Sequence, residues 1–327
     1  MGHGETAKGR HVLLADVGGT NVRFSLMHGA EIGPIEHLKV ADFSTFTEAF
    51  AAFLEQHALE RGIDAAVLDV AGPVENNRCV LTNSGWVIDG ADLQKVFGIA
   101  AVRLINDFEA VAWSLPALEP NDLYALGEQR GVKGAPMLAL GPGTGFGAAC
   151  LVFDGEQPFA VGTEAGHATL PAMSDREELV IRQLRRRFGH VSIERALSGP
   201  GLENLYSALS EIDGASVSKR NAAQITRAAL DESCETSGAA LDMFCSLLGA
   251  VAGDLALTFC ARGGVFIAGG IVPQFVQRLA RSDFRKRFEG KGRYDSYLKN
   301  IPTRIVVRPD VSFIGLKAFF EKTMRLT

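Results

Sequence analysis

A segment that reads as strand, glycine-rich turn and strand occurs twice in the chain. The first copy, residues 12–24 (VLLADVGGTNVRF), has an apolar run that ends near Asp16 and turns through residues 18–21 (GGTN). The second copy, residues 137–152 (MLALGPGTGFGAACLV), repeats this plan around residues 141–145 (GPGTG). Two such units in one chain predict two related half-domains that face each other across a shared ligand.

Both glycine turns have the composition of a phosphate-binding site. Because glycine has no Cβ atom, a ligand can approach the backbone of these turns. Successive backbone N–H groups can then form an anion-binding concavity, and Thr20 adds a hydroxyl donor. Asp16 stands at the end of its strand, where it is placed to hold magnesium against the same phosphates, directly or through water. An ordinary glycine hairpin is the alternative for the first copy taken alone. In the second copy Pro142 lacks an N–H and cannot donate to phosphate.

The size and charge of the chain limit its class. Its 327 residues exceed what a single core usually holds, so two domains are expected. Hydrophobic residues make up 47% and charged residues 22%, which excludes a largely disordered chain. The net charge of -5 argues against a dedicated nucleic-acid binder. A basic cluster that follows Glu177 and Glu178 is predicted to be a solvated helix face: Arg182, Arg185, Arg186 and Arg187.

The cysteines indicate a reducing compartment, and the N-terminal residues and the most apolar segment give no reason to assign the chain to a membrane. The five cysteines are odd in number and form no Cys-x-x-Cys pair, so we predict buried thiols: Cys79, Cys150, Cys234, Cys245 and Cys260. Residues 1–11 are polar and lack the apolar core of a signal peptide, which suggests a leader or an expression-tag remnant. The most apolar long segment, residues 241–261, is predicted to be too short and, with Asp242 and Asp254, too charged to span a bilayer.

Strands alternate with helices along the chain, which predicts parallel pairing and α/β sheets with functional loops at the carboxyl ends of the strands. Further strands are expected at residues 36–40, 65–70, 102–105, 263–268 and 303–307. Helices are expected at residues 46–62, 108–115, 174–188, 221–231, 241–261 and 312–324, with short helical pieces at 282–288 and 294–300. Ser44 is expected to cap the first helix, and Trp86 is predicted to be a core or rim residue rather than a platform for a sugar.

Several polar residues stand at strand ends. Asn106 and Asp107 follow the strand at 102–105, and Asp107 is either sited for chemistry or only the N-cap of the next helix. Glu194 precedes a Ser-Gly-Pro-Gly turn that leads into another helix. Gly269 and Gly270 end a strand just before a helix predicted near Pro273, and backbone at such a helix start can lie against a nucleotide.

A carboxylate and an imidazole, Glu164 and His167, lie three residues apart. On a helix this spacing could ligate a metal, but Gly162 and Gly166 favour a loop. We therefore predict two hydrogen-bonding groups aimed at a polar ligand, with a structural role for His167 as the alternative.

Six segments together resemble bacterial glucokinase, in the superfamily of sugar kinases, actin and heat-shock ATPases: LLADVGGTNVRF, LINDFEAVAWSLPAL, LALGPGTGFGAACLV, EAGHATLPA, ERALSGPGLENLY and GGVFIAGGIVPQF. The resemblance runs from about residue 13 to the last helix. It implies an α/β fold of two ribonuclease-H-like (actin-like ATPase) domains flanking an interdomain cleft. The small domain would be residues 12–117, joined by the C-terminal helix 310–327, and the large domain residues 118–309.

The same resemblance implies ATP-dependent phosphorylation of D-glucose to D-glucose 6-phosphate, the first step of glycolytic glucose use, with Mg2+ and in a cytoplasmic homodimer. Asp107 would be the catalytic base, and the sugar would be held by Asn106, Asp107, Glu164, His167 and Glu194. Asp16 would hold Mg2+, directly or through water. The ATP-binding residues would be Ala15, Asp16, Val17, Gly18, Gly19, Thr20, Asn21, Gly141, Gly143, Thr144, Gly145, Gly269 and Gly270.

The chain departs from the family pattern in one loop. Thr163 and Ala165 stand where a Gly-Glu-Gly-Gly-His loop usually has glycine, and the extra methyl of Ala165 is expected to tighten the sugar pocket or shift the loop. The cysteine-rich zinc motif of the related repressor and kinase family is absent from the sequence, which indicates the zinc-free branch.

Other functions stay open on these residues. One is a kinase for another hexose or amino sugar, such as mannose or N-acetylglucosamine. Another is an actin-like or chaperone-like ATPase, which needs the glycine turns but neither the Asn106-Asp107 pair nor Glu164 and His167. A sugar-sensing repressor would need a helix-turn-helix extension, which the roughly ten residues before the first strand are not expected to supply.

Overall fold

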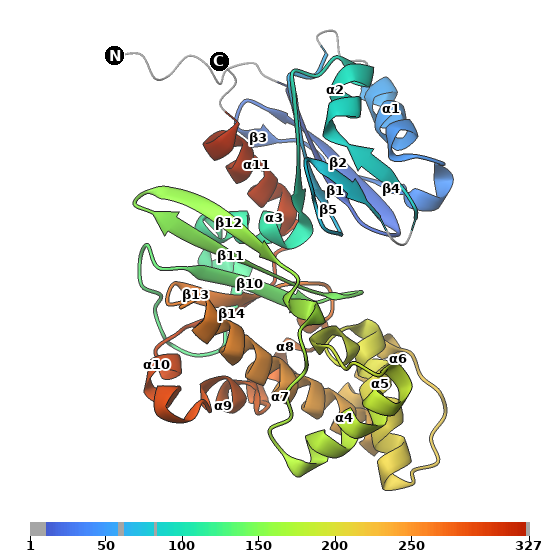
Figure 1. Ribbon diagram of the computed structural model, residues 1–327, viewed down its shortest axis with the longest axis vertical. Coiled ribbons are helices and arrows are strands. Elements are labelled where there is room, and N and C mark those ends of the chain that lie inside the picture. The colour runs from blue at the N-terminus through green and yellow to red at the C-terminus, as the bar shows by residue number, and fades with distance from the viewer. Residues whose placement is uncertain (1–10, 58–61, 82–83, 325–327) are drawn as a thin grey trace. The chain divides into compact units, whose positions relative to one another are not determined.

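The computed structural model describes residues 11–57, 62–81 and 84–324 (Figure 1). The chain divides into two compact units. The first contains residues up to Ala117 and from Pro309 onward, and the second is Leu118–Arg308. Each unit has its own sheet and its own hydrophobic core.

The first unit is built on a six-stranded mixed sheet. Its order is β3-β2-β1-β5-β8, with β4 also paired to β2. β1 runs antiparallel to β2 and parallel to β5, which is parallel to β8. The strands are β1 (His11–Val17), β2 (Asn21–His28), β3 (Glu31–Ile32), β4 (Glu36–Lys39), β5 (Ala65–Val70) and β8 (Ala101–Asn106), beside a separate hairpin of β6 (Arg78–Val80) and β7 (Val87–Asp89).

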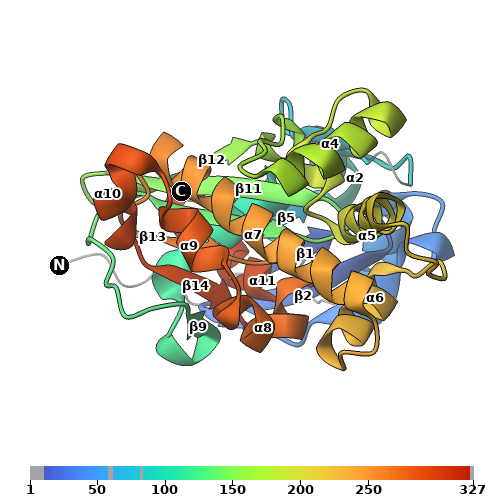
Figure 2. The ribbon, with the colours of Figure 1, turned by 90° about the horizontal axis from the view of Figure 1, so that it is seen from below.

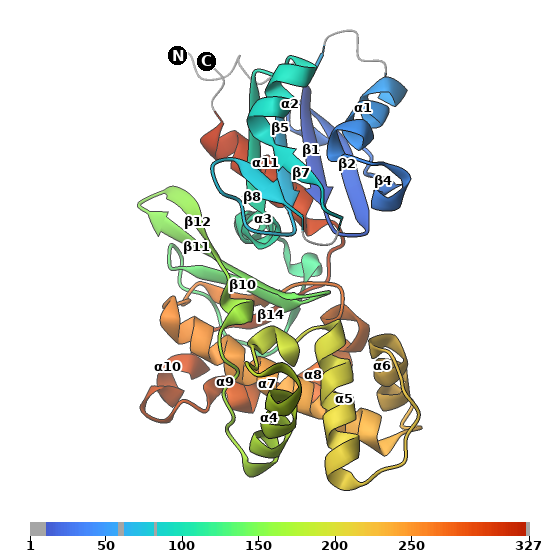
Figure 3. The same ribbon diagram turned by 45° about the vertical axis from the view of Figure 1, so that its right-hand side comes forward.

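Helices cover both faces of this sheet (Figure 3). They are α1 (Phe46–His57), α2 (Gly90–Phe97), α3 (Asp107–Ser114) and α11 (Val311–Thr323). On one face, Phe24 of β2 stacks on Phe53 of α1 with ring centroids 5.0 Å apart. On the other face, α11 packs on β1, β5 and α3. Successive side chains of β1 point to opposite faces of the sheet, one covered by α1 and the other by α11. Asp16 points to the face that α11 covers.

The second unit repeats the strand order of the first. Its sheet runs β12-β11-β10-β13-β14-β9, with β10 antiparallel to β11 and parallel to β13. Both units thus contain the same arrangement of four strands, β2-β1-β5-β8 in the first and β11-β10-β13-β14 in the second. In each, the first two strands form a hairpin, and the other two run parallel to the inner strand of that hairpin. The strands are β9 (Leu123–Ala125), β10 (Met137–Pro142), β11 (Phe146–Asp154), β12 (Gln157–Thr163), β13 (Gly264–Ile267) and β14 (Thr303–Val306).

Seven helices described in the second unit complete it (Figure 2). They are α4 (Asp175–Phe188), α5 (Gly199–Asp213), α6 (Ala222–Leu230), α7 (Glu235–Thr258), α8 (Val276–Arg281), α9 (Phe284–Glu289) and α10 (Asp295–Lys299). Figure 2 shows α7 running between α9 and the pair α5 and α6, and α7 contacts all three.

The helix α7 is longer than the sequence suggested. Among the described helices it alone has the length and composition to cross a membrane, so the prediction that this segment is too short and too charged was wrong. Within the protein, 78% of its most apolar 18-residue window is buried. This burial makes α7 the central helix of the second unit's core.

Other local predictions had mixed outcomes. Thr45, not Ser44, caps α1, because its hydroxyl accepts the N–H of Glu48 at 3.2 Å. The predicted end of that helix, beyond His57, lies outside the described residues. Trp86 is a core residue as predicted, 4% exposed. All five cysteines are free thiols, but Cys234 is only partly buried and Cys260 is exposed, so the prediction that all are buried was wrong for these two.

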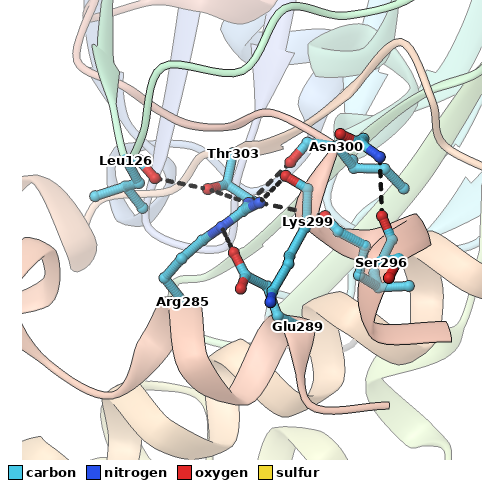
Figure 4. Close-up of polar contacts among 9 residues, drawn as sticks. Leu126, Arg285, Glu289, Ser296, Lys299, Asn300 and Thr303 are labelled. Atoms are coloured by element: carbon cyan, nitrogen blue, oxygen red, sulfur yellow. Dashed lines mark hydrogen bonds and ion pairs between the residues drawn. The ribbon is translucent and has the colours of Figure 1, made fainter. Parts of the chain in front are cut away.

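The Arg285 guanidinium joins α9 to the segment before β14 (Figure 4). Its Nε donates to Glu289 at 2.6 Å, and its terminal nitrogens donate to the carbonyls of Leu298, Lys299 and Ile301 at 3.2, 3.0 and 2.8 Å. Another bond reaches the Thr303 hydroxyl at 3.1 Å. One side chain thus satisfies acceptors at the end of α10 and the start of β14.

We expect Arg285→Met to lower the free energy of unfolding by about 3 kcal/mol, because the lost guanidinium leaves several part-buried acceptors without partners. Urea unfolding followed by circular dichroism measures the change. Arg281→Met, at an exposed arginine of α8, is the control and should change stability by less than about 0.5 kcal/mol. Equal stability of the two variants would contradict this role for Arg285.

Candidate active site

The first glycine turn connects β1 to β2, as predicted. The N–H of Gly18 donates to the carbonyl of Asn21 at 3.0 Å, so it is satisfied within the turn. In the described part of the chain, no acceptor takes the N–H of Gly19 or Thr20. These two donors and the exposed Thr20 hydroxyl are the groups that the turn offers to an anion. Ala15 and Val17 are 0% and 1% exposed, so almost no surface of either residue is open to a ligand.

Asp16 is held by two neighbours that the sequence analysis did not single out, Arg23 and Ser312. Arg23, opposite it on β2, forms ion pairs with both Asp16 and Asp310. Ser312, at the start of α11, donates to Oδ2 of Asp16 at 2.8 Å. Arg23 also binds this same oxygen. No described residue bonds to Oδ1, so that atom is the one available to a cation.

The surroundings of Asp16 fit magnesium held mainly by a ligand's phosphates. Among the described residues, no three His, Cys, Asp or Glu side chains form a group that could hold a metal ion. Magnesium in phosphate-transfer sites usually keeps several waters and takes only one or two carboxylates besides the phosphates. One oriented carboxylate beside a turn that offers N–H donors meets that requirement.

A buried carboxyl that the sequence analysis missed, Asp69, lies beside Asp16. The two residues are register partners on the parallel strands β1 and β5. Asp69 is 1% exposed, and no described residue hydrogen bonds to either of its oxygens. The pKa of Asp69 is raised well above its ordinary value, mainly because the carboxyl group is buried and further because Asp16 and Asp107 carry negative charges nearby.

This raised pKa predicts a pH-dependent stability. Above about pH 4 the unfolded chain releases the Asp69 proton while the folded chain keeps it, so the folded state loses relative stability as pH rises toward the folded pKa. Asp69→Asn removes this loss. We expect the variant to match the parent near pH 4 and to exceed it by about 1–3 kcal/mol at pH 7 to 8 in urea unfolding. An exposed control, Asp154→Asn, should show no such trend. A constant difference for Asp69→Asn across this range would contradict the raised pKa.

Asn106 and Asp107 stand where β8 passes into α3. Asn106 is the N-cap: its side chain accepts the N–H of Phe108 at 2.9 Å, and Glu109 accepts the N–H of Asn106 at 3.0 Å. The alternative that Asp107 is only the N-cap is therefore wrong. Asp107 is half-buried at the first helical position, where the helix dipole favours a carboxylate.

The second glycine turn is shorter than the sequence suggested. Gly141 and Pro142 belong to β10 and are buried, so the turn consists of Gly143, Thr144 and Gly145. The N–H of Gly143 donates to the carbonyl of Gly145 at 2.8 Å. The N–H of Gly199, at the start of α5, donates to the carbonyl of Gly143 at 2.9 Å. The turn is thus held from outside by the first residue of α5.

Glu164 and His167 lie on one short 3-10 turn, with side chains 62% and 64% exposed. Oε2 of Glu164 and Nε2 of His167 are 3.7 Å apart. Both are open to a ligand, which argues against a buried structural His167. The N–H of Ile193 donates to the carbonyl of Ala168 at 2.9 Å, which brings the turn that carries Glu194 alongside. The second unit therefore brings together three of the five predicted sugar residues: Glu164, His167 and Glu194.

The two departures in this loop are accommodated. The Thr163 hydroxyl donates to the carbonyl of Ala148 at 2.8 Å and accepts the N–H of Ala165 at 3.3 Å. Ala165 does not adopt a left-handed backbone and packs against the core. Neither position requires glycine here.

Gly269 and Gly270 follow β13. Gly269 has φ 95°, and a Cβ there would lie 2.5 Å from the carbonyl oxygen of Pro142. Glycine is therefore required at this position by the backbone conformation and packing, whether or not a ligand binds there. The helix predicted near Pro273 begins there as a 3-10 turn, Val272–Phe275, which leads into α8, a helix of only six residues. A helix this short offers little dipole to a nucleotide.

Two α/β units of like strand order, each with a glycine turn within its hairpin, are the features of a sugar kinase when they carry this set of polar residues. Comparisons with known proteins agree. The glucokinase family model matches residues 13–323. A glucokinase of Caulobacter sp. (strain K31) is 43% identical over 309 residues, 93% of each chain.

Solved structures give the same result. The crystal structure of a glucokinase from an Antarctic psychrotroph superposes with a TM-score of 0.88 at 34% identity, covering 97% of this chain and 100% of that one. A ROK family glucokinase from Streptomyces griseus, in complex with glucose and AMPPNP, shares the fold with a TM-score of 0.64 at 16% identity, covering 94% of this chain and 98% of that one. The chain belongs to the glucokinase family.

Proposed function

We propose that the chain transfers the γ-phosphoryl group of ATP to the 6-hydroxyl of D-glucose, which gives D-glucose 6-phosphate and ADP and begins glycolytic glucose use. The observation that carries the proposal is the family match from residue 13 to residue 323, which includes every candidate site segment. The complex of the Streptomyces griseus glucokinase with glucose and AMPPNP supports the choice of substrates.

The proposed architecture is that of the actin-like ATPases. Residues 12–117 with the C-terminal helix 310–327 are the small ribonuclease-H-like domain, and residues 118–309 are the large one. Residues of both domains act on the same pair of substrates. The repeated strand order supports this assignment.

Asp107 is the proposed catalytic base. It takes the proton of the sugar 6-hydroxyl as O6 bonds to the γ-phosphorus and the bond to the leaving ADP oxygen breaks. Its place at the start of α3 favours the ionised form that a base needs. Asp16 would hold Mg2+, directly or through water, and the ion would supply positive charge to offset that of the phosphates.

Sugar recognition is assigned to Asn106, Glu164, His167 and Glu194, together with Asp107. A site built on hydrogen bonds to hydroxyls rejects analogues that lack them, because its own polar groups are then left unpaired. The donors of the two glycine turns would bind the triphosphate, and Gly269 and Gly270 would lie near the adenosine. We place the enzyme in the cytoplasm as a homodimer that binds neither nucleic acid nor membranes.

ADP release with a panel of sugars tests the function. We expect a high rate with glucose, a lower kcat/KM with mannose and N-acetylglucosamine, and a rate without sugar that is orders of magnitude slower. Preference for another sugar would replace glucose in the proposal. Comparable rates with and without sugar would favour an ATPase whose product is a conformational change.

A further inference from the structure

We propose that Glu194 links sugar binding to phosphate binding: one carboxylate oxygen holds the second glycine turn in place and the other receives the sugar. The inference deepens the proposed function and rests on it for the identity of the sugar. It assigns a positioning role to a residue that the family resemblance treats only as a sugar contact.

The first part of the link is a hydrogen bond to the turn. Oε2 of Glu194 accepts the N–H of Phe146 at 3.0 Å, and Phe146 is the residue directly after the turn. The main chain around Glu194 is fixed as well, because the Ser198 hydroxyl donates to the Glu194 carbonyl at 2.8 Å. From the same segment, the N–H of Gly199 holds the carbonyl of Gly143 at 2.9 Å. Residues 194–199 therefore hold both ends of the turn.

The second part is the close approach of the carboxylate to Gly145. A Cβ added to Gly145 would lie 2.4 Å from Oε2 of Glu194, closer than real contacts allow. The backbone of Gly145 is outside the left-handed region, so the carboxylate, not strain, is what opposes a side chain there. Glycine at this position keeps the carboxylate against the turn.

The third part of the link is the second carboxylate oxygen of Glu194, Oε1. No described residue hydrogen bonds to Oε1 of Glu194, and the residue is only half-buried. The turn that carries it lies alongside the one that carries Glu164 and His167. A sugar hydroxyl that donates to Oε1 would fix the carboxylate, and with it Phe146 and the turn. Binding of either substrate then favours the geometry that binds the other.

Gly145→Ala tests the link, with Gly143→Ala as the matched control in the same turn. A Cβ at Gly143 meets no atom within 4 Å. Glucose binding is measured by calorimetry without nucleotide. We expect Gly145→Ala to weaken it by about 5- to 150-fold, the usual range for coupled sites, and Gly143→Ala to leave it within about 2-fold. Equal glucose affinities for the two variants would overturn the proposal.

The effect of Glu194 on phosphate binding is tested by measuring ATP affinity in the absence of sugar. Glu194→Gln keeps an oxygen that can accept the N–H of Phe146, whereas Glu194→Ala does not. We expect ATP binding to weaken in Glu194→Ala and to stay within about 2-fold of the parent in Glu194→Gln. Unchanged ATP affinity in Glu194→Ala would reduce Glu194 to a sugar contact. If the parent enzyme prefers another sugar, the proposed function fails on its own, and the same comparison with that sugar still decides the link.

Discussion

Asp107→Asn is expected to lower kcat for glucose phosphorylation by about 100- to 10,000-fold, the usual worth of a positioned general base. The amide is close to the carboxylate in shape and keeps an oxygen that can accept the N–H of Phe108, a bond that Asp107 makes at 2.9 Å. The start of α3 should therefore stay folded. What is lost is the capacity to take the proton of the sugar hydroxyl, so the chemical step slows. Steady-state kinetics at saturating glucose and ATP measure the change.

Asp92→Asn is the matched control for this variant. Asp92 is an exposed carboxylate in the first turn of another helix of the same unit, α2, so its loss removes a similar charge from a helix start. Its kcat should equal that of the parent. An Asp107→Asn enzyme within a few-fold of the parent would remove Asp107 from the role of base.

Gly315→Ala is expected to destabilise the chain and to slow catalysis. A Cβ at Gly315 on α11 would lie 1.7 Å from the carbonyl oxygen of Ala110 and 3.2 Å from the N–H nitrogen of Ser114, both on α3. Backbone cannot move aside as a side chain can, so the two helices must separate, at a cost of about 1–3 kcal/mol. Because Asp107 begins α3, a displacement of about 1 Å would also lower kcat, by roughly 100-fold.

The control for this prediction is Gly238→Ala on α7. There the nearest atom to an added Cβ is a side-chain nitrogen of Arg278 at 3.7 Å, an ordinary contact. The higher helix propensity of alanine should leave this variant as stable as the parent, or up to about 1 kcal/mol more stable. Thermal unfolding and kcat of both variants are the measurements. A Gly315→Ala chain as stable and active as Gly238→Ala would show that the helices do not depend on this contact.

Those parts of the fold that depend on local signals could be predicted from the sequence. Residues 18–20 form a turn because two glycines follow an apolar strand, and α4 begins after Ser174 because serine is a strong N-cap. The helix α5 begins two residues before the expected turn ends, because Pro200 in a first turn needs no N–H partner. The short helix α2 was not predicted, although Asp89 accepts two N–H groups at its start.

The interactions that orient the site could not be read from local sequence. Ser312 is 296 positions from Asp16, and Asp310 is 287 positions from Arg23, so only the folded first unit brings these groups together. One sequence signal could have identified Asp69 as a buried carboxyl group, because it is a carboxylate within an otherwise apolar strand (AAVLDV). Glu194 could be proposed as a sugar contact, but its bond to Phe146, 48 positions away, required the structure.

Phosphorus NMR of the enzyme with ATP, Mg2+ and glucose tests the central claim most directly. We predict that D-glucose 6-phosphate and ADP appear in equal amounts, and that almost no ATP is consumed when glucose is left out. Inorganic phosphate appearing with ADP at the same rate in both samples would contradict the claim, because the enzyme would then transfer the phosphoryl group to water rather than to the sugar.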